Sequence, residues 1–200
     1  MTSHFKTENG CPISLLGYGA MRLQTVDGGH ANGWVKTGYS TSNIDQELMN
    51  RQVKYLLDQG VTYFDTSPAY CRGESEARLG TALRASGYDR ASYVLATKLS
   101  NFAPQQMKLD ACKEMFEQSL KFLRTDSIDN YLLHSIGMGG WEAFENRFLK
   151  NGAVDWCRSL RDHGRIKKLG FSYHGDPKAF AWCMEHHDQY HWDFCQIQMN

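Results

Sequence analysis

Short apolar runs alternate with longer segments of helical periodicity along most of the sequence. The runs are rich in β-branched, leucine and aromatic residues, and they lie at Val61–Phe64, Tyr93–Thr97, Ile128–Leu133, Ile166–Ser172 and Asp193–Met199. Runs of this kind are typical of strands that are covered on both faces. Between them, apolar residues recur at intervals of three and four, which indicates amphipathic helices. Strand and helix in strict alternation predict a parallel sheet with right-handed crossovers.

The predicted helices carry ordinary start and stop signals. The first begins at an Asp45 cap and ends at Gly60, a residue suited to a helix C-terminus. The other four are expected over Glu74–Ser86, after Pro104 as far as Leu123, over Phe144–His163, and from Asp176, which precedes Pro177. No linker or low-complexity segment divides the chain, so we expect residues 1–200 to belong to one domain.

The N-terminal part predicts a hairpin, a glycine-rich strand and a loop. Asn9-Gly10 lies between two short alternating runs in the segment 5–16, which is a strong two-residue hairpin signal. Glycines interrupt the strand predicted at Ser14–Met21, as they do where a ligand or another backbone approaches closely. The polar segment Gln24–Asn43 lacks apolar periodicity and is expected to be a long loop, either a substrate-side flap or a mobile insertion.

Composition excludes several classes of function. The sequence has 22 basic and 22 acidic residues, so no net charge draws the protein to nucleic acid or to an anionic membrane. No apolar run approaches the ~18 residues of a membrane span, and the N-terminus lacks the apolar core of a signal peptide. The six cysteines form no C-x-x-C pair, which favours reduced thiols. We therefore expect a cytoplasmic protein.

Three predicted strands run into ionisable side chains. Asp65, Lys98 and His134 follow successive apolar runs, and Ser67-Pro68-Ala69 forms a turn that brings Tyr70 back over Asp65. Parallel strands deliver such residues to the same end of a sheet. A phenol with a pKa of about 10 is a poor acid at neutral pH unless a positive charge lies beside it. Taken singly, the aspartate could cap a turn, the lysine could be solvated and the histidine could be a satisfied semi-buried residue.

Taken together, these residues resemble the catalytic tetrad of the aldo-keto reductase family. Asp65, Tyr70, Lys98 and His134 follow the family order at similar spacing. Gly170-Phe171-Ser172 resembles the family's fifth strand, and Gln196-Ile197-Gln198 its sixth. The C-terminal segment is most similar to a bacterial subgroup whose longer members carry a ferredoxin-like iron–sulfur segment, so a cluster is expected only in a segment beyond Asn200.

The resemblance implies an NADPH-dependent reduction of a small aldehyde or ketone by hydride transfer. Tyr70 is then the general acid, and Lys98 lowers its pKa. Asp65 holds Lys98 in place, and His134 orients the substrate carbonyl. The resemblance also implies cofactor contacts, with Ser172 and Gln196 on the nicotinamide carboxamide and Gly19, Met21 and Asp65 lining the pocket. Tyr173 stands where many members have asparagine, which leaves that contact open.

The resemblance further implies a (β/α)8 TIM barrel, an α/β fold that takes about 250 residues. Six predicted strands, five helices and the N-terminal hairpin use all 200 residues. We therefore expect part of a longer protein, with a barrel domain that is C-terminally incomplete. Two alternatives to an active reductase are a non-catalytic nicotinamide-binding regulatory or interaction subunit and an inactive barrel fragment. The physiological substrate and the oligomeric state stay open.

One further cluster suggests a metal site. Cys183, His186, His187 and His191 lie close together in the sequence, but their spacing matches no closed zinc motif. On a helix, His187 and His191 share a face from which His186 points away. A solvated, aromatic-rich helix end is therefore the favoured interpretation, and no metal ligand is assigned.

Overall fold

The computed structural model describes residues 4–6, 12–32 and 43–198. The chain forms two compact units. The first comprises Met1–Thr97 and Ser119–Thr125, and the second comprises Lys98–Gln118 and Asp126–Asn200. Among the helices of the described ranges, none combines the length and the apolar character needed to cross a membrane.

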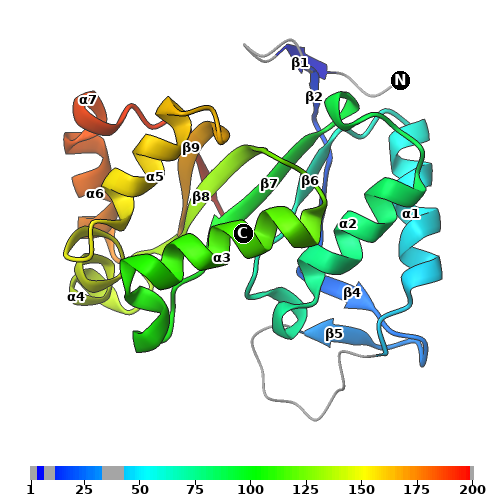
Figure 1. The fold of residues 1–200 in the computed structure, drawn as a ribbon, viewed down its shortest axis with the longest axis horizontal. Coiled ribbons are helices and arrows are strands. Elements are labelled where there is room, and N and C mark those ends of the chain that lie inside the picture. The colour runs from blue at the N-terminus through cyan, green and yellow to red at the C-terminus, as the bar shows by residue number, and fades with distance from the viewer. Residues whose placement is uncertain (1–3, 7–11, 33–42, 199–200) are drawn as a thin grey trace. The chain divides into compact units, whose positions relative to one another are not determined.

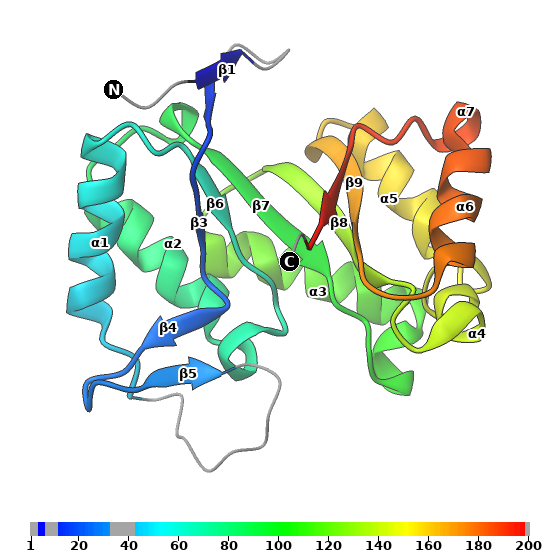
Figure 2. The same ribbon diagram turned by 180° about the vertical axis from the view of Figure 1, so that it is seen from behind.

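The first unit is built on three parallel strands in the order β3-β6-β7. These strands are β3 (Gly17–Gly19), β6 (Tyr63–Asp65) and β7 (Val94–Leu99). Helices α1 (Gln46–Asp58) and α2 (Ser75–Ala85) lie side by side against one face of β6 and β7, as Figures 1 and 2 show from opposite sides. The Asp45 carboxylate accepts the Leu48 N–H at 2.8 Å, which confirms the predicted start of α1.

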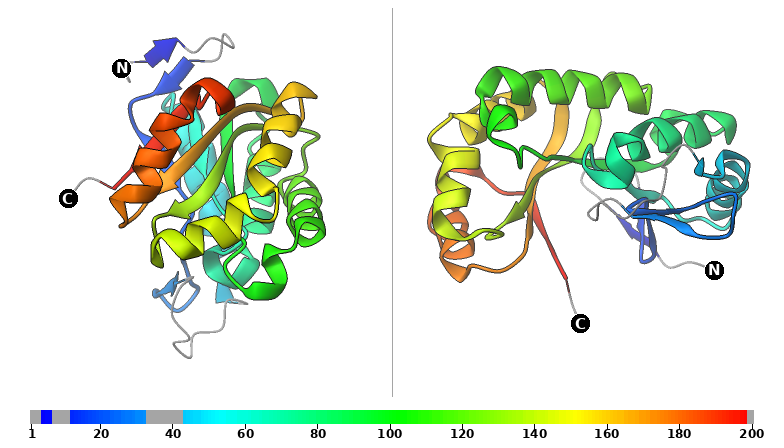
Figure 3. Two further views of the ribbon diagram at one scale, coloured as in Figure 1. Left: turned by 90° about the vertical axis from the view of Figure 1, so that its left-hand side faces the viewer. Right: turned by 90° about the horizontal axis from the view of Figure 1, so that it is seen from below.

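The second unit continues the same pattern of strands. The last two residues of β7 belong to it, and the order runs β7-β8-β9-β10. Here β8 is Ile128–Ile136, β9 is Ile166–Tyr173 and β10 is Phe194–Ile197. The helices are α3 (Leu109–Leu123, shared with the first unit), α4 (Gly140–Phe144), α5 (Ala153–Asp162), α6 (Pro177–Glu185) and α7 (His187–Tyr190). The two views of Figure 3 show α4 to α7 together on one side of β8 and β9.

The strand order identifies the class of α/β fold. In both units each parallel strand is followed along the chain by its neighbour in the sheet, with helices in between. A doubly wound sheet instead reverses its strand order at a switch point. Sequential order is that of a (β/α)8 barrel, so the predicted fold class is confirmed for the strands present.

One predicted helix is wrong in its first half. The stretch Phe144–His163 is not a single helix, because a π-helix (Glu145–Leu149) follows α4 and α5 starts only at Ala153. Gly152 has a φ of 73°, in the left-handed region, and breaks the helical path. The Asn151 side chain accepts the Ala153 N–H at 3.0 Å and so begins the new helix.

The N-terminal predictions are confirmed in part. Strands β1 (His4–Lys6) and β2 (Pro12–Ser14) pair antiparallel, whereas the Asn9-Gly10 turn lies outside the described residues. The prediction of a loop over Gln24–Asn43 is wrong at its start. There β4 (Arg22–Gln24) and β5 (His30–Asn32) form an antiparallel hairpin, and the segment 33–42 lies outside the described residues. A hairpin this short has too few residues to show periodicity.

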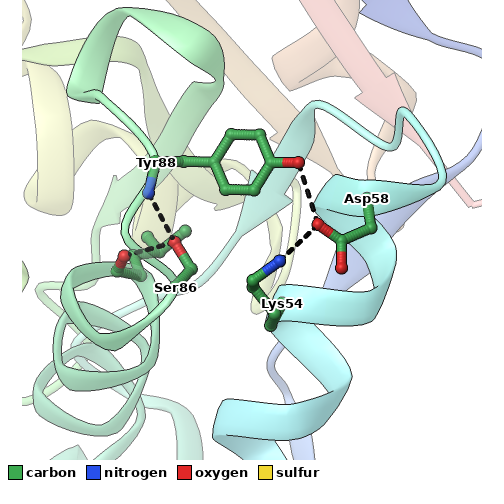
Figure 4. A network of polar contacts seen from close by, with 5 residues as sticks. Lys54, Asp58, Ser86 and Tyr88 are labelled. Carbon is green, nitrogen blue, oxygen red and sulfur yellow. Dashed lines mark hydrogen bonds and ion pairs between the residues drawn. The ribbon is translucent and has the colours of Figure 1, made fainter.

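A polar network fixes α1 against the loop that follows α2 (Figure 4). The Tyr88 hydroxyl donates to Asp58 Oδ1 at 2.9 Å, and Lys54 Nζ lies 2.6 Å from the same oxygen. Lys54 also lies over the Tyr88 ring, 5.5 Å from its centroid. The bonds from Lys54 and Tyr88 lower the pKa of Asp58. Because these groups are solvated, the network adds little to the free energy of unfolding. Its main effect is to hold the loop after α2 in place.

Gly80 marks a close approach between α2 and α3 in the first unit. A Cβ at this position would overlap the Phe122 carbonyl oxygen and lie 2.9 Å from Leu123 Cα, both main-chain atoms of α3. We predict that Gly80→Ala lowers the free energy of unfolding by about 1–3 kcal/mol, because α3 must move away. The control Thr81→Ala, on the next residue of α2, should stay within about 0.5 kcal/mol of wild type. Urea unfolding measures both, and a Gly80→Ala protein of wild-type stability would contradict this packing.

Candidate active site

Asp65 ends β6 in the first unit and is buried there. It pairs in register with Gly19 of β3, and the Ala20 N–H donates to the Asp65 carbonyl oxygen at 2.8 Å. A Cβ on Gly19 would meet no atom within 4 Å. Met21 follows and is half-buried. The structure therefore places Gly19 and Asp65 side by side and Met21 just beyond them.

Tyr70 is buried at the start of a 3-10 turn, Tyr70–Gly73. Its N–H donates to the Ser67 carbonyl oxygen at 3.1 Å, and the Ser67 hydroxyl accepts the Ala69 N–H. The turn predicted between Asp65 and Tyr70 is therefore confirmed. Directly after Tyr70, Cys71 and Arg72 have φ values of 49° and 54°, in the left-handed region. Such residues cost on the order of 1–3 kcal/mol each and persist only where their surroundings hold them.

The surroundings that hold this turn come from β3 and the β4–β5 hairpin. The Cys71 thiol is fully buried and lies 3.9, 3.5 and 3.7 Å from the carbonyl oxygens of Ala20, Met21 and Ala31. Burial raises the pKa of this thiol, so it stays a neutral donor. The hairpin that the sequence did not predict is thus part of the frame around Tyr70.

Sequence reasoning also missed a set of buried polar contacts that hold α2 against the strands. The Ser75 hydroxyl lies 2.7 Å from both the Thr66 hydroxyl and the Ala20 carbonyl oxygen. The Glu76 carboxylate accepts from the hydroxyls of Thr97, at 2.6 Å, and Ser119, at 3.1 Å. Buried polar groups need such partners, so these bonds fix where β6 and β7 end relative to α2.

In the second unit, Lys98 and His134 are both buried, with 1% and 2% of their surface exposed. Ser100 links them, because its Oγ lies 2.7 Å from His134 Nδ1 and 3.4 Å from the Lys98 carbonyl oxygen. The Phe102 ring meets the imidazole edge-on, with centroids 5.1 Å apart. These two predicted site residues therefore lie at strand ends joined through one serine.

The electrostatic surroundings keep His134 neutral. Burial is the main cause that moves its pKa well below the ordinary value of 6.5, and Coulomb interactions with Lys98, Arg147 and His174 lower it further. At pH 7 the ring is therefore an uncharged imidazole. Such a ring can donate a hydrogen bond from one nitrogen and accept one at the other.

Ser172 and Gln196 are direct partners in the register of β9 and β10. Opposite residues of a strand pair project to the same face of the sheet, so both side chains share one face. The Ser172 hydroxyl accepts the Ser135 N–H at 2.7 Å and keeps its own hydrogen for another acceptor. Gln196 is exposed and offers a donor and an acceptor. The donors and acceptors of Ser172 and Gln196 fit a carboxamide. The neighbouring Tyr173 hydroxyl instead donates to the Gly175 carbonyl oxygen.

No sequence pattern pointed to Arg147, which is 3% exposed. It lies in the π-helix, whose spacing follows neither helical nor strand periodicity. Its guanidinium donates to the carbonyl oxygens of His134, at 2.6 Å, and Ser135, at 3.3 Å. Burial lowers the pKa of Arg147 to about 10, so it still carries its charge at neutral pH.

The Cys183–His191 stretch has the aromatic character expected of it. His186 stacks on Trp182 with centroids 4.1 Å apart, and the rings of His187 and His191 lie 6.3 Å apart, edge to face. Cys183 is buried, and its carbonyl oxygen accepts from the Trp192 indole. Within the described residues, no group of three or more His, Cys, Asp or Glu side chains could hold a metal ion.

Comparison with known proteins identifies relatives over most of the chain. A family model described as "Aldo/keto reductase family" matches residues 16–200. The aldo-keto reductase YhdN of Bacillus subtilis (strain 168) is 36% identical over 144 residues, which cover 70% of this chain and 41% of the relative. Aflatoxin B1 aldehyde reductase member 2 of Rattus norvegicus is 28% identical over 129 residues, covering 64% of this chain and 33% of the relative.

A solved structure agrees on the fold. The crystal structure of an aldo-keto reductase from Klebsiella pneumoniae in complex with NADPH has a TM-score of 0.66 and 21% sequence identity. The match covers 100% of this chain and 59% of that one. The chain thus spans less than half the length of the two curated relatives and about three-fifths of the solved structure.

The depressed pKa of His134 makes stability depend on pH. An unfolded histidine binds a proton below about pH 6.5, whereas the folded ring does not until a lower pH. We predict that stability falls as the pH drops below about 6.5, with a slope from His134 of up to about 1.4 kcal/mol per pH unit until the folded pKa is reached.

Urea unfolding between about pH 7.5 and 5 measures this dependence. His134→Gln should remove the His134 part of the slope, and the control His163→Gln, at an exposed position, should retain it. If stability depends on pH equally in His134→Gln and in wild type, the His134 ring has the same pKa in the folded and unfolded protein, which would contradict this prediction.

Proposed function

Because the chain belongs to the aldo/keto reductase family, we propose that the protein is an NADPH-dependent oxidoreductase that reduces an aldehyde or ketone to an alcohol. The observation that carries the proposal is the order of four residues at the ends of consecutive parallel strands. Asp65 ends β6 and Tyr70 follows it, Lys98 lies in β7 and His134 in β8. Ends of barrel strands are where catalytic residues of this fold class lie.

The chemistry requires a proton donor and a charge that assists it. NADPH, when bound, supplies the hydride, and negative charge develops on the carbonyl oxygen. Tyr70 donates its phenolic proton to that oxygen in the proposed mechanism. The Lys98 ammonium favours the phenolate that remains, and Asp65 orients the ammonium. Each pKa unit by which Lys98 favours the phenolate corresponds to about 1.4 kcal/mol of interaction free energy.

His134 orients the substrate in this proposal. A neutral imidazole donates a hydrogen bond to the carbonyl oxygen without delivering a proton, and the depressed pKa of His134 provides such a ring at pH 7. A charged imidazolium would compete with Tyr70 as the acid. The division of roles between acid and orienting donor therefore follows from the environment of each side chain.

The cofactor contacts of the proposal follow the resemblance to the family. Ser172 and Gln196 hold the nicotinamide carboxamide, which their shared face and donor set support. Gly19, Met21 and Asp65 line the cofactor pocket, with Gly19 leaving room for close approach. Since a relative with 28% identity is named an aldehyde reductase, an aldehyde is the substrate class to test first.

Three wider expectations stay predictions. Residues 1–200 belong to a single barrel domain, and the protein is cytoplasmic. An iron–sulfur cluster is expected only in a segment beyond Asn200, because no group of three or more His, Cys, Asp or Glu side chains among the described residues could hold a metal ion. Iron and sulfide analysis of the protein at its full natural length tests the cluster directly.

Replacing the proposed acid separates catalysis from binding. Tyr70→Phe should lower turnover of aldehydes by about 10²- to 10⁴-fold, the usual contribution of a general acid, while the Kd for NADPH stays within a few-fold. The control Tyr88→Phe removes a hydroxyl from an exposed tyrosine of the same unit and should leave turnover unchanged.

NADPH oxidation and fluorescence titration of the full-length protein measure these two quantities. Undiminished turnover in Tyr70→Phe would overturn the assignment of the acid. NADPH binding without turnover of any aldehyde or ketone by wild type would instead indicate a non-catalytic, nicotinamide-binding subunit.

A further inference from the structure

We propose that Cys71 is a positioning residue for Tyr70, and that its buried thiol fixes the phenol relative to the segment Gly19–Met21. The inference rests on the proposed function, in which Tyr70 is the acid and Gly19–Met21 lines the cofactor pocket. Cys71 belongs neither to the four residues recognised from the sequence nor to the predicted cofactor contacts. The thiol, the phenol and the segment all lie in the first unit.

The backbone directly after Tyr70 has an unusual conformation. Cys71 has a φ of 49° and a ψ of 43°, Arg72 a φ of 54° and a ψ of 31°, and Gly73 a φ of 93°. Residues that carry a Cβ disfavour positive φ, whereas glycine adopts it without a steric penalty. Cys71 and Arg72 therefore keep this conformation only because their surroundings hold them in it.

The thiol of Cys71 makes contacts that hold this backbone. Its sulfur lies 3.5 Å from the Met21 carbonyl oxygen, 3.7 Å from that of Ala31 and 3.9 Å from that of Ala20, and the side chain is fully buried. Because the thiol stays protonated, its S–H is available as a donor to these oxygens. The acceptors lie in two segments, one directly after β3 and the other in β5. One side chain thus ties the residue after Tyr70 to both.

A second set of contacts joins the Tyr70 turn to the same segment. The Ala20 carbonyl oxygen also accepts from the Ser75 hydroxyl at 2.7 Å, and Ser75 begins α2 directly after the turn. The Ala20 N–H donates to the Asp65 carbonyl oxygen at 2.8 Å, just before the turn. The chain on either side of Tyr70 is therefore anchored on Ala20. Cys71 adds the anchor next to the phenol itself.

The type of residue at position 71 argues for a role of the sulfur. A glycine there would adopt the left-handed backbone without strain, and an alanine would carry the same strain without a donor. Cysteine carries the strain and adds a buried sulfur contact. Strained residues of this kind cluster at functional sites, where they hold groups in place before the reaction.

Positioning of the acid affects the rate more than it affects cofactor binding. A general acid has to lie within hydrogen-bond reach of the oxygen that it protonates. A displacement of about 1 Å can lower a rate about 10²-fold. The affinity for NADPH instead depends on contacts spread over the whole cofactor. Loss of the thiol should therefore lower kcat and leave the Kd for NADPH nearly unchanged.

The first test measures this split in the protein at its full natural length. Cys71→Ala should lower kcat for an aldehyde by about 10- to 100-fold, with the Kd for NADPH within a few-fold of wild type. Cys71→Ser keeps a donor on a shorter bond, so its kcat should lie between those of Cys71→Ala and wild type. The matched control Cys157→Ala removes a fully buried thiol from α5 and should leave kcat unchanged.

Two outcomes of this test would overturn the proposal. A wild-type kcat in Cys71→Ala would show that the thiol does not position the acid. A Cys71→Ser protein no faster than Cys71→Ala would show that a donor at this place has no effect on the rate.

The second test separates the sulfur contact from the backbone strain. Cys71→Gly removes the Cβ from a left-handed position, so this variant should unfold at a higher temperature than Cys71→Ala. Its kcat should nevertheless be as low as that of Cys71→Ala, because both lack the sulfur. A Cys71→Gly protein with the wild-type kcat would overturn the role of the thiol, and one that unfolds below Cys71→Ala would contradict the strain at this position.

The third test observes the phenol without substrate. Carbon-13 NMR of protein labelled at tyrosine Cζ should show one Tyr70 signal in wild type, identified by its loss in Tyr70→Phe. Cys71→Ala should show several Tyr70 signals or a broadened one. A Tyr70 signal with the wild-type shift and width in Cys71→Ala would overturn the proposal.

These readouts distinguish a failure of this inference from a failure of the proposed function. The NMR result can hold even if wild type reduces no carbonyl, and in that case only the proposed function fails. An unchanged Tyr70 signal and an unchanged kcat in Cys71→Ala would leave the proposed function standing and remove the role of Cys71. If Cys71→Ala and Cys71→Gly do not fold, Cys71→Ser decides, because a kcat and a Tyr70 signal identical to wild type would overturn the proposal.

Discussion

The hydrogen bond between Ser100 and His134 Nδ1 is the interaction on which the chemistry of the second unit depends. Two basic side chains, Lys98 and His134, are buried there at strand ends, where a second positive charge is unfavourable. The imidazole of His134 stays uncharged, which avoids a second buried positive charge. A neutral ring has one N–H that donates and one nitrogen that accepts, so it needs a partner for each. Ser100 Oγ lies 2.7 Å from Nδ1 and is one such partner. Arg147, Phe102 and Ser172 fix the ring and the backbone around it.

A comparable constraint shapes the first unit. Its strand ends carry Asp65 and, after a tight turn, Tyr70, and the turn contains two residues in left-handed conformations. The Cys71 thiol, buried among three carbonyl oxygens, holds that turn against β5 and the residues that follow β3. Buried hydroxyls and Glu76 hold α2 in the same manner. In both units apolar residues build the strands, and short polar contacts set the positions of the strand ends.

These two kinds of interaction explain what the sequence could and could not predict. The strands, most helices and the order Asp65, Tyr70, Lys98 and His134 follow from apolar runs and caps, which are local signals. The cofactor contacts of Ser172 and Gln196 were expected only through resemblance and stay predictions, whereas the register that pairs the two residues comes from β9 and β10. Arg147 could not be found, because a π-helix has no periodic signature and its partners are carbonyl oxygens. The β4–β5 hairpin and the Cys71 turn depend on tertiary contacts in the same way.

The central claim is that hydride passes between a nicotinamide and a substrate carbonyl. The most direct measurement supplies the full-length protein with an aldehyde and NADPH deuterated at nicotinamide C4, in each of its two diastereomers, and follows the label by mass spectrometry. If hydride transfer occurs, one diastereomer delivers a single deuterium to the former carbonyl carbon of the alcohol product. Alcohol that forms without label from either diastereomer, or no alcohol at all from a panel of aldehydes and ketones, would contradict it.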